Sequence, residues 1–214
     1  MNTKKIFGLL ILFLLISILG ACQSTKEVTV KRSDNVKTEE TDNESKSTDL
    51  EKKEEAESKL GSRTNPVLLQ QTATVEDKLY NNDGDEFAIK FDLTVSEVIR
   101  GEEAFNQLKT MNEFNEAAPE GYEWVLAKTK VNFTESETQD LSFMIDGIMN
   151  FNMVSESGDI YSGDIVPTTE PDFSFELYVG SEQEGYIGGL VKTGEKAQLR
   201  YQDMLDGHVF FNLQ

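Results

Sequence analysis

The chain has 214 residues, with one Cys, one His and 39 acidic against 20 basic side chains, which gives a formal net charge of −19. A single Cys excludes an internal disulfide, a CxxC redox pair and a Cys-rich zinc site, and a single His excludes HExxH and three-histidine metal centres. Nucleic acid is a poor partner for so acidic a chain, because its phosphates would repel it.

Residues 1–21 have the organisation of a secretion signal. Lys4 and Lys5 precede an apolar run over residues 6–19, and small residues lead on to Cys22. The run is shorter than the roughly 20 residues of a membrane-spanning helix, which is the alternative interpretation. With Cys at the cleavage position, the segment resembles the lipobox of bacterial lipoproteins. The resemblance implies that Cys22 receives a diacylglyceryl group and anchors the mature chain at the extracytoplasmic face of the cell membrane, because two acyl chains anchor a protein stably.

Residues 22–62 comprise Cys22 and a charged segment that contains no Phe, Tyr or Trp. Such a composition buries too little apolar area to offset the entropy of ordering, so we predict a disordered tether. A random coil of this length reaches about 35 Å, and a fully extended chain roughly 130 Å. We interpret the tether as a spacer that holds a domain off the membrane; a tail that only aids solubility is the alternative.

The domain predicted after the tether comprises residues 63–214, with 28 acidic and 10 basic side chains, so most of the acidity belongs to it. Apolar and polar residues alternate over residues 87–95 and 125–133, which predicts half-buried strands. Tyr122 and Trp124 give the start of the second strand another apolar face. We therefore expect a central strand with both aromatic side chains in the core, rather than on an exposed platform for sugar or peptide. Shorter strands are predicted over residues 67–75, 142–154, 173–179, 185–192, 197–201 and 208–213.

One segment has helical rather than alternating spacing. Ala104, Leu108 and Met111 recur at helical intervals within residues 101–116, and Pro119 follows as a helix breaker. Roughly eight short strands with regular turn signals and one short helix predict an all-β fold, an immunoglobulin-like β-sandwich. The domain is long enough to bury a core without disulfides.

Several stretches of the domain occur in an order that we can compare with known families. They read GSRTNPV, RGEEAF, NEFN, PEGYEWVL and GYIG, at residues 61–67, 100–105, 112–115, 119–126 and 185–188. In this order they resemble a large family of lipoproteins and secreted proteins of unknown function, found mostly in Gram-positive bacteria. That family is described as telokin-like and is related to a mycobacterial immunoprotective extracellular antigen. The resemblance implies an immunoglobulin-type sandwich with an extracytoplasmic adhesion, binding or accessory role, and it supplies no catalytic residues.

Acidic loops are the candidate metal ligands. The segment 81–86 (NNDGDE) clusters oxygen ligands, but the EF-hand pattern fails because Glu86 and Asp92 stand where Gly and Glu are required, so a hairpin turn is the simpler interpretation. Other loops offer further carboxylates at Asp159, Asp164, Glu182 and Glu184. They leave a weak divalent-cation or solute binder as an alternative function, although we predict no metal or cofactor.

No catalytic constellation emerges from the remaining polar residues. His208 would have to serve any Ser-His-Asp triad, yet the chain has no GxSxG motif, so we interpret it as an ordinary strand or turn histidine. Glu120 and Glu123 are interpreted as solvated or structural. Three methionines are expected to fill the core, namely Met144, Met149 and Met153.

These observations predict a lipid-anchored cell-surface binding module without catalysis, which contacts the membrane through Cys22. Its partner is expected to be a protein or another component of the envelope, and the acidity favours a basic one. An envelope structural or stress accessory protein is the alternative from a different functional class.

Overall fold

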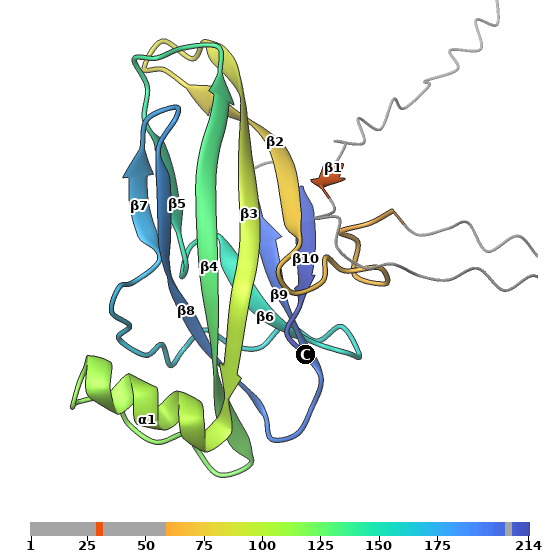
Figure 1. Ribbon diagram of the computed structural model, residues 1–214, viewed down its shortest axis with the longest axis vertical. Coiled ribbons are helices and arrows are strands. Elements are labelled where there is room, and N and C mark those ends of the chain that lie inside the picture. The colour runs from red at the N-terminus through yellow and green to blue at the C-terminus, as the bar shows by residue number, and fades with distance from the viewer. Residues whose placement is uncertain (1–28, 32–58, 204–206) are drawn as a thin grey trace, which may run out of the picture.

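The computed structural model describes residues 29–31, 59–203 and 207–214. The predicted signal sequence, Cys22 and most of the predicted tether lie outside the described residues. The described ranges contain ten strands and one helix, arranged as Figure 1 shows. No helix in these ranges is both long and apolar enough to cross a membrane.

The strands form three antiparallel sheets. The largest contains, in spatial order, β1 (Thr29–Lys31), β2 (Thr72–Tyr80), β3 (Glu86–Arg100), β4 (Tyr122–Ser136) and β8 (Glu182–Lys192). The second contains β10 (His208–Asn212), β9 (Ala197–Gln202) and β6 (Phe151–Ser155), and the third pairs β5 (Phe143–Asp146) with β7 (Ser174–Leu177). Buried side chains from all three sheets share one core, in which Phe91 of β3 packs on Phe143 of β5 with ring centroids 4.5 Å apart. The predicted all-β sandwich with one short helix is confirmed.

The strand β3 continues past the predicted end of its alternation at Val95. The register against β4 shifts between Val95 and Glu97, so Ser96 is an inserted bulge residue. A bulge changes which face the following side chains occupy, and this is why the apolar alternation breaks while the strand continues. The shorter strands also differ at their ends: β2 begins at Thr72, and the strand predicted over residues 142–154 divides into β5 and β6.

The helix α1 (Gly101–Met111) covers the outer face of the largest sheet near the end of β3 (Figure 1). Its buried Ala104 and Leu108 pack against Trp124 and neighbouring apolar residues of β4 and β8. The start of β4 is therefore buried on both faces, as predicted for a central strand. The prediction was wrong for Tyr122, whose side chain is 40% exposed, because it occupies the first position of β4 and lies outside the cluster under α1.

Two short parts of the predicted tether, residues 29–31 and 59–62, lie within the described residues. Residues 29–31 form β1, which pairs with residues 72–74 of β2, and β-branched Thr and Val favour this extended conformation. Gly61 is buried, and its carbonyl accepts the Phe210 N–H at 2.9 Å. Residues 29–31 therefore extend the edge of the largest sheet, and Gly61 is hydrogen-bonded to β10.

Candidate functional site

The chain between β6 and β7 crosses from one sheet to the other, and we call residues 160–172 the strap. At its beginning, Tyr161 N–H donates to Met153 O of β6 at 2.9 Å. Near its end, Tyr186 N–H of β8 donates to Pro171 O, also at 2.9 Å. Because β6 and β8 are edge strands, the strap connects the edges of the two larger sheets.

Glycines in β8 allow the strap and β6 to approach closely. A Cβ atom on Gly185 would lie 2.3 Å from Asp172 O, and one on Gly188 would lie 2.4 Å from Pro167 Cγ. Contacts this short are incompatible with any side chain at the two positions unless the strap moves. The Gly-Tyr-Ile-Gly stretch at residues 185–188 therefore has a structural role, because it forms the surface against which the strap packs.

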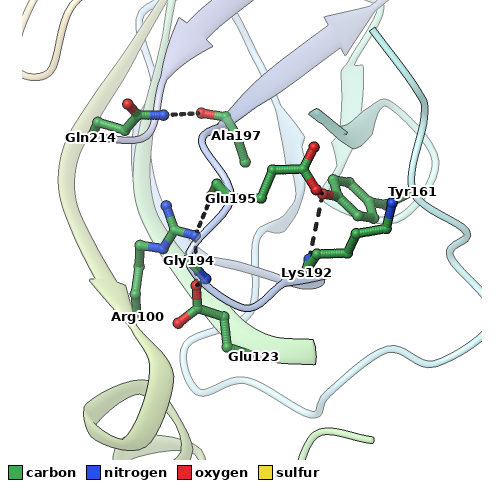
Figure 2. A network of polar contacts seen from close by, with 8 residues as sticks. All are labelled: Arg100, Glu123, Tyr161, Lys192, Gly194, Glu195, Ala197 and Gln214. Atoms are coloured by element: carbon green, nitrogen blue, oxygen red, sulfur yellow. Dashed lines mark hydrogen bonds and ion pairs between the residues drawn. The ribbon is translucent and has the colours of Figure 1, made fainter. Parts of the chain in front are cut away.

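The beginning of the strap is also held by Tyr161, whose hydroxyl donates to Glu195 Oε2 at 2.6 Å (Figure 2). The same hydroxyl oxygen accepts the Lys192 N–H at 3.4 Å. Burial, followed by the neighbouring Glu195 carboxylate, raises the pKa of Tyr161 to about 12. The hydroxyl therefore keeps its proton at neutral pH and remains a hydrogen-bond donor.

The turn between β8 and β9, which carries Glu195, is fixed by a half-buried ion pair. Arg100 Nη2 lies 2.7 Å from Glu123 Oε1 and also donates to Glu195 O at 2.7 Å. Glu123 Oε1 accepts the Gly194 N–H at 3.0 Å as well (Figure 2). Glu123 is therefore structural, and through this turn the ends of β3 and β4 help to position the strap.

A second loop, the turn at residues 147–150 between β5 and β6, faces the strap. The Asp146 carboxylate accepts the N–H groups of Ile148 at 2.8 Å and Met149 at 3.0 Å, together with the Ser174 hydroxyl at 2.7 Å. Partial burial by itself would raise the pKa of Asp146, but these three hydrogen bonds outweigh it and hold the pKa below its usual value. The turn is thus rigidly supported, yet its two apolar side chains point outward: Ile148 is 63% exposed and Met149 is 82% exposed.

Two adjoining hollows lie between this turn and the strap, and together they form what we call the apolar hollow. The larger part measures about 310 Å³, and Ile148 and Val166 line both parts. Ile165 lines the smaller part, and its side chain is 49% exposed. Exposed apolar residues that gather around a concavity mark interaction sites in soluble proteins. This surface is the candidate functional site.

The sequence did not point to this site, because Met149 was expected in the core. Met144 and Met149 are 73% and 82% exposed, so the prediction of core methionines was wrong for both. It is confirmed for Met153, which is buried under the strap's attachment to β6. The Asp-Gly sequence at residues 146–147 marks a turn in the middle of this apolar stretch, and a turn exposes side chains that a continuous strand would bury.

The other predicted site residues lie apart from the apolar hollow. His208 is exposed at the start of β10, with its ring centroid 6.3 Å from that of Phe210. Asn81 Oδ1 accepts the N–H groups of Asp83 and Asp85, which confirms the hairpin turn before β3. Cys22 lies outside the described residues.

The acidic loop residues form separate, local contacts. Glu182 pairs with Lys130 and Glu184 with Lys128, while Asp159 accepts a hydrogen bond from a nearby serine hydroxyl. Within the described ranges, no three His, Cys, Asp or Glu side chains converge as metal ligands would. The alternative of a divalent-cation binder stays a prediction, for which calorimetric titration with calcium is the direct measurement.

The fold and the apolar hollow define a class, an antiparallel β-sandwich with an exposed apolar surface between a turn and the strap that connects its two larger sheets. No family of known proteins matches the sequence, and no curated protein is similar to it. Among solved structures, the chain is similar to a Bacillus subtilis protein that is described provisionally as a lipoprotein (ycdA), with a TM-score of 0.37 and 13% sequence identity. That similarity covers 56% of this chain and 35% of the other.

Proposed function

We propose that the protein is a lipid-anchored binding module that holds a protein partner at the apolar hollow, without catalysing a reaction. The observation that carries the proposal is the combination of exposed Ile148, Met149 and Ile165 with a supporting frame of hydrogen bonds. Side chains that are exposed on a rigid frame lose little conformational freedom on binding, so they suit a preformed interface. A loosely packed surface would lack the hydrogen bonds that fix the 147–150 turn and the strap.

The anchor is the second part of the proposal. The Leu-Gly-Ala-Cys sequence that ends at Cys22 supports lipidation of this residue and attachment to the extracytoplasmic face of the membrane of a Gram-positive bacterium. The β-sandwich is compatible with the immunoglobulin-type family whose motifs the sequence resembles. In this arrangement the tether places the apolar hollow where proteins of the envelope are within reach.

The test compares two exposed methionines. Membranes carrying an affinity-tagged protein are solubilised, and the proteins captured by the wild type, Met149→Ser and Met144→Ser are identified. Met149 is adjacent to Ile148, which lines the hollow, whereas Met144 is similarly exposed but belongs to β5 and serves as the matched control. We expect one partner with the wild type and Met144→Ser that is lost with Met149→Ser. Capture that does not depend on residue 149, or turnover of a substrate panel without any partner, would overturn the proposal.

A further inference from the structure

The charged side chains that line the apolar hollow are acidic. Between Lys130 and Lys192 the chain contains no Lys, Arg or His, but it contains twelve acidic residues. This stretch supplies the 147–150 turn, the strap and most of β8, and therefore most of the wall of the hollow. The residues that line the two parts of the hollow include Asp146 and Asp172 and no basic side chain.

Two acidic residues of this stretch are paired with lysines of β4. Lys128 Nζ lies 2.8 Å from Glu184 Oε1, and Lys130 Nζ lies 3.2 Å from Glu182 Oε2. Both pairs cross from β4 to the first residues of β8, before Gly185. Among the described residues, no basic side chain pairs with the acidic side chains of the strap, so the local field at the hollow is negative.

Asp172 is the carboxylate that remains available at the hollow. Asp146 is fully engaged, because it accepts two backbone N–H groups and the Ser174 hydroxyl. Asp172 is exposed and lines the larger part of the hollow, and no ion pair to its carboxylate forms within the described residues. An exposed carboxylate beside apolar side chains fits a ligand that carries a cation next to an apolar group.

The charge also disfavours the other occupants of an apolar surface. A second copy of this chain would bring the same acidic surface into contact, and an anionic lipid surface would be repelled in the same way. Resting on the proposed function of the hollow, we propose that its partner is a protein segment in which Lys or Arg flanks an apolar side chain. The apolar side chain enters between Ile148 and Val166, and the cation pairs with Asp172.

The experiment uses three synthetic octapeptides and the purified full-length protein in nanodiscs of zwitterionic lipid, with empty nanodiscs as background. The basic peptide carries two leucines and two lysines, the acidic peptide replaces the lysines by glutamates, and the polar peptide replaces the leucines by serines. Binding is measured by fluorescence anisotropy of labelled peptides. We expect binding of the basic peptide alone, weakened several-fold when NaCl rises from about 0.05 M to about 0.3 M.

Variants locate the binding on the protein. We expect Ile148→Ser to weaken binding of the basic peptide roughly tenfold through lost apolar contact, and Asp172→Asn to weaken it about threefold through the lost exposed ion pair. Met144→Ser and Asp83→Asn are the matched controls, since both residues are exposed and lie outside the hollow, and they should leave binding unchanged.

The outcomes separate this inference from the proposed function. Binding of the acidic peptide as tightly as the basic one, or no effect of Asp172→Asn, overturns the inference about charge but leaves the hollow as a binding surface. Failure of the basic peptide to bind, while the partner in membranes still depends on residue 149, likewise overturns only the inference. Loss of both the peptide binding and the dependence of capture on residue 149 overturns both.

Discussion

The glycine at position 185 offers the sharpest test of how the strap is held. In Gly185→Ala, the new Cβ atom would meet Asp172 O at 2.3 Å, Asp172 C at 2.7 Å and Phe173 N at 2.9 Å. All three atoms belong to the backbone, so no side chain can rotate away to relieve the contact. We expect the end of the strap to leave β8, and with it the wall of the larger part of the hollow.

The expected loss of stability follows from the contacts that the displaced end of the strap would lose. The Tyr186 N–H would lose Pro171 O at 2.9 Å, and the Thr169 hydroxyl would lose Tyr186 O at 3.1 Å. Two hydrogen bonds contribute about 1 kcal/mol each, and residual crowding adds about 1–3 kcal/mol. The free energy of unfolding should therefore fall by about 4 kcal/mol, which at a urea dependence of about 2 kcal/mol per molar lowers the midpoint by about 2 M.

Urea unfolding of the purified protein measures this change, with Gly163→Ala as the control. Gly163 belongs to the same strap, but a Cβ atom there would meet nothing within 4 Å, so its midpoint should stay within the range of a neutral surface change. Hydrogen exchange gives the local measurement, because the amide of Tyr186 should lose its protection in Gly185→Ala. Equal midpoints for the two variants, with Tyr186 still protected, would refute the close approach of strap and β8.

Three further predictions concern the anchor, a tyrosine and the first strand. Metabolic labelling with a palmitate analogue should mark the wild type and not Cys22→Ala; label that persists in the variant would contradict lipidation at this position. The folded state raises the pKa of Tyr161 to about 12, so its stabilising contribution is complete below pH 10 and declines as pH rises through about 12. Absorbance titration of the phenolates should show a step near pH 12 that is missing in Tyr161→Phe, whereas identical titrations would rule the hydrogen bond out. In a chain with Cys22 replaced by Ser, cysteines at the facing positions Thr29 and Thr74 should form a disulfide on mild oxidation, and moving the first to Lys31 should prevent it. Equal yields from the two pairs would mean that β1 does not pair with β2 in this register.

Local periodicity was sufficient to predict the frame of the fold. The alternation through Phe91 and through Val131 predicted the two long strands, and the helical spacing of Ala104 and Leu108 predicted α1. The apolar residues on both faces at the start of β4 predicted its central position, because a strand covered on both sides must bury both sets of side chains. These elements depend on neighbours within the same short stretch of sequence.

The candidate site depends on contacts between distant segments, which periodicity does not report. The strap has no repeating pattern, and its path is set by the space left at Gly185 and Gly188, more than ten residues further along the chain. The sequence also did not predict the exposure of Met149, because this residue lies in an apolar stretch. Its backbone N–H bonds to Asp146 in a turn, and its side chain is exposed. The absence of basic residues between Lys130 and Lys192 was visible in the sequence, but its meaning requires knowing that this stretch encloses the apolar hollow.

The most direct measurement of the central claim is site-specific photo-crosslinking in living cells. A photoreactive phenylalanine analogue is placed at Met149 beside the apolar hollow and, as a control, at Tyr80, which is exposed at the end of β2. A module that holds a protein partner at the hollow should give one discrete crosslinked species in the membrane fraction from position 149 and none from position 80. No adduct at position 149, or the same adducts from both positions, would contradict the assignment of the apolar hollow as the binding surface.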